Sequence, residues 1–293
     1  MLTFVGTISS SISIGKKYSL RHDSKVPASR MMENGGESID DDNPIQTKIK
    51  NFEYLDSEAI KKSMSSMATS YPDFVTFGTA QEWYGLPTAG GEDDCKFDAD
   101  VVGCKNYIMI IEDKNGMINN SSIAEVFLSG AVHGNERIGP TTVVETARML
   151  LEAAECEALP HVNVNGTYSD EDIAKAIDCR EDLTSRGIFP WVRRWLARLV
   201  TTRRIVVVPS ANALGYHRNV REENSIDPNR DFAFDQKDWS HCMRTIAGRT
   251  INEIFREHIF QHSLTYHGGM VAIAYEWGAP SRNSPKGIPS PDE

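Results

Sequence analysis

Short apolar runs separated by amphipathic stretches dominate the chain from about residue 52 onward. Several of these runs are rich in β-branched residues and lack the alternation of polar and apolar positions that marks a half-exposed strand. Such runs predict strands that are buried on both faces of a sheet. The predicted strands are 74–78, 106–112, 125–132, 204–209 and 270–275.

Between these runs, apolar residues recur three and four positions apart, as on one face of a helix. In the first such stretch Ile60, Met64 and Met67 share a face, and Asp56 or Ser57 can cap the N-terminus. The predicted helices are 56–70, 139–152, 186–199 and 242–260. Because strands and helices alternate, we expect an α/β fold with a mixed, mostly parallel sheet flanked by helices. In such sheets, ligands bind beyond the carboxyl ends of the strands.

The pattern also divides the chain into parts. Residues 1–50 are rich in Ser, Gly, Asp and Asn and show little apolar periodicity, which predicts a flexible N-terminal leader. Residues 51–293 then form one folded domain, with an acidic, polar insert at about 155–185.

Composition narrows the choice of partners. The chain has 293 residues, 31 Lys and Arg against 41 Asp and Glu, and a formal net charge of -10. An acidic surface disfavours nucleic acid and anionic membranes as main partners, although a local basic patch can persist. No apolar run reaches the roughly 18–20 residues that span a bilayer, so no membrane span is predicted. No pattern specifies an oligomeric state.

Cysteines and targeting signals leave the compartment open. Two cysteine pairs can each close a loop with a disulfide in an oxidising compartment: Cys95 with Cys104, and Cys156 with Cys179. Five reduced cysteines in a cytosolic protein fit equally well. N-glycosylation triplets, which favour secretion, begin at Asn119, Asn120 and Asn165. The N-terminus, however, lacks a basic region and is a poor signal peptide.

Two motifs suggest a metal site. In His133-Gly-Asn-Glu136, directly after a predicted strand, a histidine and a carboxylate three residues apart can point at one spot and form half of a hydrolytic zinc site. This pattern alone is common by chance. His267 ends another apolar stretch and precedes two glycines, which permit close backbone approach to a ligand. Alone, His267 would fit better as a hydrogen-bonded core residue.

An arginine-rich segment follows the strand at 204–209. Arg218 and Arg221 stand three residues apart, and the pair Asn229-Arg230 comes soon after. The planar guanidinium of arginine matches a carboxylate through two hydrogen bonds, so this segment suggests an anion-binding loop. A solvated basic loop is the alternative.

Together these motifs resemble a known family. His-Gly-Asn-Glu, Pro-x-x-Asn-x-x-Gly-Tyr, Asp-x-Asn-Arg and Tyr-His-Gly-Gly occur here in the order and approximate spacing of zinc metallocarboxypeptidases of the carboxypeptidase A/B superfamily. The forms of the motifs look most like the carboxypeptidase N/E branch. The resemblance covers about residues 52–293 and implies a carboxypeptidase-like α/β/α fold.

The resemblance also implies roles. His133, Glu136 and His267 would hold one Zn²⁺ per chain. The other motif residues would act on the C-terminus of a peptide or protein, whose last peptide bond the enzyme hydrolyses. Asn229 and Arg230 match the pair that grips the terminal carboxylate, Arg221 matches the catalytic arginine that polarises the scissile carbonyl, and Arg218 would be its accessory.

One departure from the family concerns the general base. In the family, the catalytic glutamate lies several tens of residues beyond the third zinc ligand, whereas His267 is close to the end of this chain. Glu276 comes too early and Glu293 is the last residue, so neither is assigned this role. The expectation is therefore a C-terminally incomplete catalytic domain.

Two other functions stay open. An aspartoacylase or succinylglutamate desuccinylase-like zinc amidohydrolase shares His-Gly-Asn-Glu and Asn-Arg, but its third ligand usually has an Asp-x-His context, unlike His267. A non-catalytic protein that binds zinc or peptides would keep the ligands and lack the base.

Overall fold

The computed structural model describes residues 3–6, 53–98, 102–116, 123–160, 167–232, 241–269 and 273–274. Most of the predicted leader lies outside the described residues, as do the three glycosylation asparagines, Glu276 and Glu293, but Thr3–Gly6 of that leader form a strand of the sheet. Of the predicted strand 270–275, only Ile273 and Ala274 are described.

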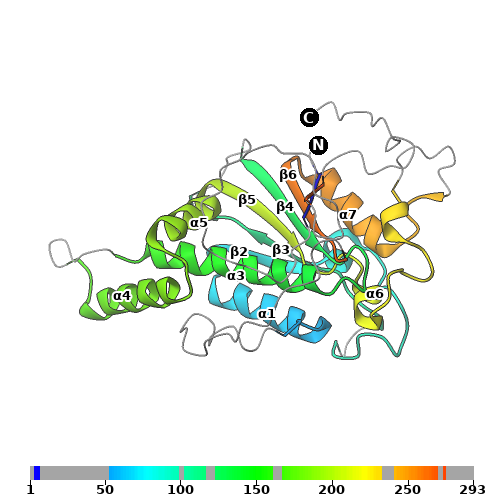
Figure 1. The fold of residues 1–293 in the computed structure, drawn as a ribbon, viewed down its shortest axis with the longest axis horizontal. Helices are drawn as coiled ribbons and strands as arrows, with labels where there is room; N and C mark the ends of the chain where they lie inside the picture. The colour runs from blue at the N-terminus through cyan, green and yellow to red at the C-terminus, as the bar shows by residue number, and fades with distance from the viewer. Residues whose placement is uncertain are drawn as a thin grey trace, which may run out of the picture. The chain divides into compact units, whose positions relative to one another are not determined.

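One mixed sheet forms the centre of the fold (Figure 1). In the described residues it has seven strands, in the order β2-β3-β5-β4-β6-β1-β7. They are β1 (Thr3–Gly6), β2 (Val75–Thr79), β3 (Tyr107–Ile111), β4 (Ala124–Gly130), β5 (Arg203–Val208), β6 (Phe260–Tyr266) and β7 (Ile273–Ala274).

The strands are mostly parallel. β5, β4, β6 and β1 pair in parallel, whereas β3 runs antiparallel to its neighbours β2 and β5, and β7 runs antiparallel to β1. Five of the seven described strands therefore point in one direction. This confirms the predicted α/β fold with a mixed, mostly parallel sheet.

Both faces of the sheet are covered, which explains the uninterrupted apolar runs. On β5, Ile205 and Val207 pack into one core, whereas Val206 and Val208 pack into the other. Successive side chains point to opposite faces, so a strand with two covered faces needs apolar residues throughout. The first core is covered by α1 (Ser57–Ser70), α3 (Ile138–Ala158) and α5 (Pro190–Thr202), and the second by α2 (Ala80–Tyr84) and α7 (Ile246–Glu257).

Helix boundaries follow local capping. The Asp56 side chain accepts a hydrogen bond from the Ala59 N–H and starts α1, whose buried face is the predicted Ile60, Met64 and Met67. α5 starts at Pro190, later than predicted, after a left-handed turn at Gly187. α7 is shorter than predicted, because Thr245 caps its start and Phe260 already belongs to β6.

The predicted polar insert needs correction, because most of it is helical. Residues 155–158 continue α3, and α4 (Asp170–Ser185) follows. Ser169 and Asp172 form a capping box at its start, and Leu183 is buried in the first core. Sparse apolar residues on a mostly exposed helix hid its period from the sequence pattern.

Both proposed cysteine pairs are disulfides. Cys95 and Cys104 have Cα atoms 5.1 Å apart, and Cys156 and Cys179, which link α3 to α4, have Cα atoms 5.9 Å apart. Within the described ranges, no helix combines the length and apolar character needed to cross a membrane.

Candidate metal centre

The three predicted metal ligands meet at the carboxyl edge of the sheet. β4 and β6 are parallel neighbours, and their last residues, Gly130 and Tyr266, lie opposite each other. His133 follows β4 and His267 follows β6 directly, so strand pairing brings together two histidines that are far apart in the sequence. Glu136 comes from the loop between β4 and α3.

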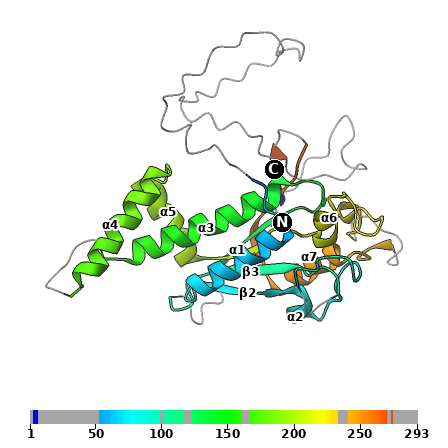
Figure 2. The same cartoon turned by 90° about the horizontal axis from the view of Figure 1, so that it is seen from below.

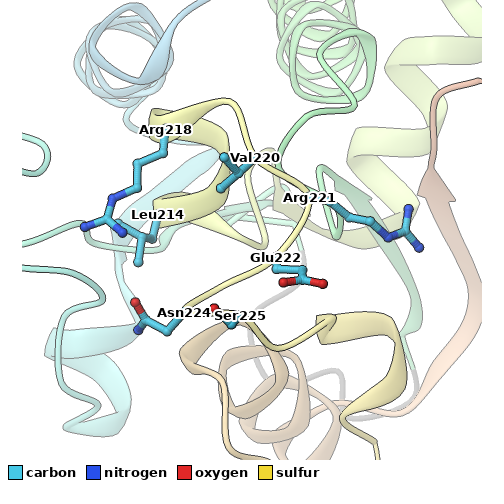
Figure 3. Close-up of a pocket in the computed structure, with 7 residues that line it drawn as sticks. All are labelled: Leu214, Arg218, Val220, Arg221, Glu222, Asn224 and Ser225. Carbon is cyan, nitrogen blue, oxygen red and sulfur yellow. The ribbon is translucent and has the colours of Figure 1, made fainter.

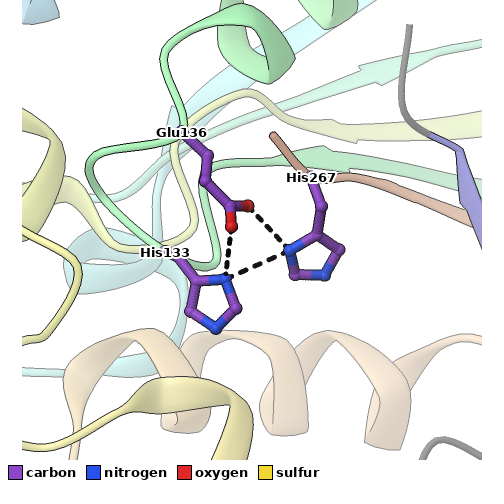
Figure 4. A group of neighbouring side chains, drawn as sticks. All are labelled: His133, Glu136 and His267. Carbon is purple, nitrogen blue, oxygen red and sulfur yellow. Dashed lines mark hydrogen bonds and ion pairs between the residues drawn. The ribbon is translucent and has the colours of Figure 1, made fainter. Parts of the chain in front are cut away.

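The ligand atoms converge closely (Figure 4). His133 Nδ1 donates to Glu136 Oε1 at 2.8 Å, and His267 Nδ1 donates to Glu136 Oε2 at 2.7 Å. The two Nδ1 atoms are 3.2 Å apart. The potential ligand atoms of all three residues lie within 4.8 Å of one another, and no other group of three or more such ligands is found in the described part of the chain.

This geometry fits a zinc ion. Tetrahedral zinc with ligand atoms at about 2.0–2.1 Å keeps those atoms roughly 3.3 Å apart. The nitrogen–nitrogen separation of 3.2 Å matches this value, whereas the contacts to Glu136, at 2.8 and 2.7 Å, are about half an ångström shorter. In addition, two Nδ1–H groups facing one another repel, and a cation would replace both protons. Two histidines and one glutamate are a typical catalytic zinc set.

Electrostatic interactions keep the Glu136 carboxylate charged. Burial alone would raise the pKa of Glu136, but hydrogen bonds from His133 and His267 outweigh it and bring the pKa down to about 2. His133 is buried, and His267 and Glu136 are half-buried. Glu136 is therefore an anion at neutral pH and would act as a charged ligand.

Asp227, the first residue of the Asp-x-Asn-Arg motif, lies behind the centre, and the sequence analysis assigned it no role. Its Oδ1 lies 3.2 Å from His133 Nε2, a buried atom that makes no hydrogen bond of good geometry. Its Oδ2 accepts from Arg221 Nε at 3.1 Å and Nη2 at 2.9 Å. Burial raises the pKa of Asp227, but Arg221 and the Asn229 N–H outweigh this and lower it. A carboxylate behind a ligand histidine orients the ring and increases its basicity.

Asp227→Asn should therefore weaken zinc binding by about 10- to 100-fold, because Asn keeps the shape but loses the charge behind His133. Competition with a chelating dye would measure the affinity. Asp94→Asn is the matched control, since Asp94 pairs with Arg218 instead. Equal zinc affinities of the two variants would exclude this role for Asp227.

The structure brings one predicted arginine to the cluster. Arg221 Nη1 is 3.9 Å from Glu136 Oε1, and its backbone carbonyl accepts from the Gly134 N–H at 3.1 Å. Its side chain is 42% exposed, so it can reach a molecule bound beside the ligands.

Arg218, the predicted accessory arginine, has an acidic partner of its own. It lies at the end of α6 (Ala213–Arg218) and forms a bidentate pair with Asp94, with both contacts at 2.7 Å. Figure 3 shows that Arg218 and Arg221 point in opposite directions. Arg218 is the last residue of α6, which Asn212 caps, whereas Arg221 lies in the segment that follows the helix.

Asn229 and Arg230 lie on a 3-10 helix, η1 (Pro228–Arg230), directly after Asp227. Asp227 Oδ1 accepts from the Asn229 N–H at 2.9 Å, so the residue behind His133 also starts this turn. Both side chains are exposed. A pocket of about 600 Å³ is formed by α6 and the segment that follows it, and is lined by Leu214, Arg218, Val220, Arg221, Glu222, Asn224 and Ser225 (Figure 3).

The segment from Arg218 to Asp231, called the arginine loop below, is anchored to α7 by two buried carboxylates. Glu223 accepts from the N–H groups of Ile246 and Ala247, and Asp231 accepts from the N–H and hydroxyl of Thr245. These contacts satisfy donors at the start of a helix, where a negative charge is also favourable. The loop is thus held at both ends.

Comparisons of sequence find no match. No family model and no curated protein matches this sequence.

Comparisons of structure do find matches. Thrombin activatable fibrinolysis inhibitor matches over 74% of this chain with a TM-score of 0.46 and 13% identity, covering 48% of that structure. Carboxypeptidase A from Helicoverpa armigera matches over 74% with a TM-score of 0.43 and 15% identity, covering 46%. A succinylglutamate desuccinylase from a Silicibacter species matches over 67% with a TM-score of 0.35 and 16% identity, covering 40%. The chain thus spans less than half the length of these proteins.

Proposed function

We propose that this chain carries the metal centre of a zinc-dependent metallocarboxypeptidase, which hydrolyses the C-terminal peptide bond of peptides or proteins. The observation that carries the proposal is the convergence of His133, Glu136 and His267 beside a loop of arginines. One side of the centre binds a cation, and the other offers groups that bind an anion, as a substrate with a free carboxylate requires.

The three ligands and Asp227 would hold the metal. Zinc bound there supplies Lewis acidity and a water molecule whose pKa is lowered toward ~7. Glu136 contributes its negative charge, and Asp227 keeps the His133 ring oriented with Nδ1 toward the centre.

The arginine loop would bind and polarise the substrate. Arg221, already beside Glu136, would stabilise negative charge that develops on the scissile carbonyl oxygen, where a fixed cation has its largest effect on rate. Asn229 and Arg230 would donate hydrogen bonds to the terminal carboxylate. In this proposal Arg218 has no substrate contact, because Asp94 occupies its guanidinium group.

Peptide binding tests the anion-binding half. With zinc bound, the chain should bind peptides with a free C-terminus at least about tenfold more tightly than the amidated forms, since a hydrogen bond to a charged group contributes roughly 1.5–3 kcal/mol. Arg230→Ala should bring the two affinities close together without changing the zinc content. Titration calorimetry measures both.

Arg256→Ala is the matched control, because Arg256 is an exposed arginine on α7 that pairs with Glu253 on the same helix. A preference for free C-termini that survives in Arg230→Ala would exclude the assigned role of Arg230.

A second candidate is a zinc-dependent peptide-binding protein without turnover. Among the described residues, the carboxylates that contact the cluster are Glu136 and Asp227, and both are held by histidine or arginine partners. Neither is therefore available as a general base. Peptide binding without release of a C-terminal residue would favour this candidate, and hydrolysis of N-acyl amino acids but not peptides would favour a desuccinylase-like amidohydrolase.

A further inference from the structure

An exposed stripe of tryptophans and arginines runs along α5, away from the metal centre. Trp191 is 70% exposed and Trp195 is 58% exposed, and these are large apolar side chains to leave in water. Arg194 and Arg198 are exposed beside them. The helix has no acidic residue.

The helical period places these four side chains on one face. At 3.6 residues per turn, positions 191, 194, 195 and 198 fall within an arc of about 100°. The opposite face carries the buried residues Arg193, Leu196, Ala197 and Val200. The stripe is therefore the outward surface of a helix whose other side is fixed in the first core.

The order of residues in the stripe is self-complementary. It reads Trp-x-x-Arg-Trp-x-x-Arg from Trp191 to Arg198. If a second α5 lies antiparallel, with a twofold axis between positions 194 and 195, Trp191 faces Arg198 of the other copy and Trp195 faces Arg194. Every tryptophan then meets an arginine, and no arginine meets an arginine. Guanidinium groups stack favourably on aromatic faces.

We propose that the α5 stripe is a homodimer interface between two copies of this chain, paired antiparallel about a twofold axis. Twofold dimers use the same patch on both subunits, so the patch must complement itself, as this one does. The arrangement removes four tryptophan faces from water.

Charge argues against an anionic membrane on the same surface. α4 lies next to α5 in the fold (Figure 2) and carries six acidic side chains against two basic ones. An anionic bilayer that met α5 would also meet these acidic groups. A second copy placed on the stripe instead presents its own Trp and Arg side chains to it.

Sedimentation equilibrium of the full chain tests the proposal. One helix face buries less than the ~800 Å² per partner of a standard interface, so a weak, reversible dimer is expected, with a Kd above about 1 µM. Measurements should therefore extend to about 500 µM. Trp191→Ala/Trp195→Ala and Arg194→Ala/Arg198→Ala should each weaken dimerisation by at least about tenfold.

A mixture of the two double variants shows whether weaker dimerisation comes from the loss of Trp–Arg contacts or from misfolding of the variants. The arginines of the first variant would face the tryptophans of the second, so the mixture should form more dimer than either variant alone. Ile259→Ala, at an 82% exposed apolar residue outside α5, is the control and should leave dimerisation unchanged.

A chain that is monomeric throughout this range, or a dimer that both double variants leave intact, would overturn the proposal. So would binding of the monomer through α5 to vesicles of phosphatidylcholine and phosphatidylserine at roughly 7:3, which would identify the stripe as a membrane surface.

Discussion

His133→Ala should abolish stoichiometric zinc binding while leaving the chain folded. His133 supplies one of two nitrogens that lie 3.2 Å apart, and it also connects the centre to Asp227. Its loss should lower zinc affinity by more than about 100-fold, the upper end of what removing a supporting hydrogen-bond partner costs. Metal analysis after dialysis and dye competition would measure the effect.

His262→Ala is the matched control for this prediction. His262 lies on β6, close in sequence to His267, but it is exposed and belongs to no ligand group among the described residues. Zinc affinity should stay at the wild-type value in this variant. Glu136→Gln, which keeps the shape of the side chain, should resemble His133→Ala. If His133→Ala retained one tightly bound zinc ion, the ligand assignment would be wrong.

Gly134→Ala, which adds a single methyl group beside the site, should strongly destabilise the fold. A Cβ at Gly134 would lie 2.0 Å from the carbonyl carbon of Gly215 and 2.4 Å from the Tyr216 nitrogen. These are backbone atoms of α6, so no side chain can rotate away. Either the loop of His133 or α6 must move, and we expect a loss of about 3 kcal/mol in the free energy of unfolding.

Gly91→Ala provides the comparison, because a Cβ there meets nothing within 4 Å. Denaturant unfolding of both variants, with zinc titrations of each, would measure stability and site geometry together. Because Gly134 follows His133 directly, its variant should also bind zinc more weakly. Similar stability and zinc affinity in the two variants would show that this part of the fold is not tightly packed.

The sequence predicted the parts of the fold that depend on local patterns. α1 has both a capping aspartate and a regular apolar spacing, and the runs 107–111 and 205–208 are apolar at every position. The sequence analysis missed α4 because few of its residues are buried. It also missed α6, a helix of six residues capped by Asn212, because the hydrophobic pattern predicted no element in that segment.

For the site, local motifs identified ligands but not their support. His133 and Glu136 are close in sequence, whereas His267 comes from a second motif far along the chain, and the family resemblance implied that the three meet. Asp227 contacts His133 from a distant part of the chain, and Arg218 finds its partner Asp94 in the same way. Contacts of this kind depend on how loops cross in space, which no spacing encodes.

The metal centre cannot form during folding until β4 has paired with β6. The two histidines are 134 positions apart in sequence, and they meet only when these strands align in register. Contacts between distant segments require closure of a long loop and tend to form slowly. Zinc affinity therefore reports completed folding. Protein molecules that bind zinc with the native affinity must already have paired β4 with β6 at the centre of the sheet.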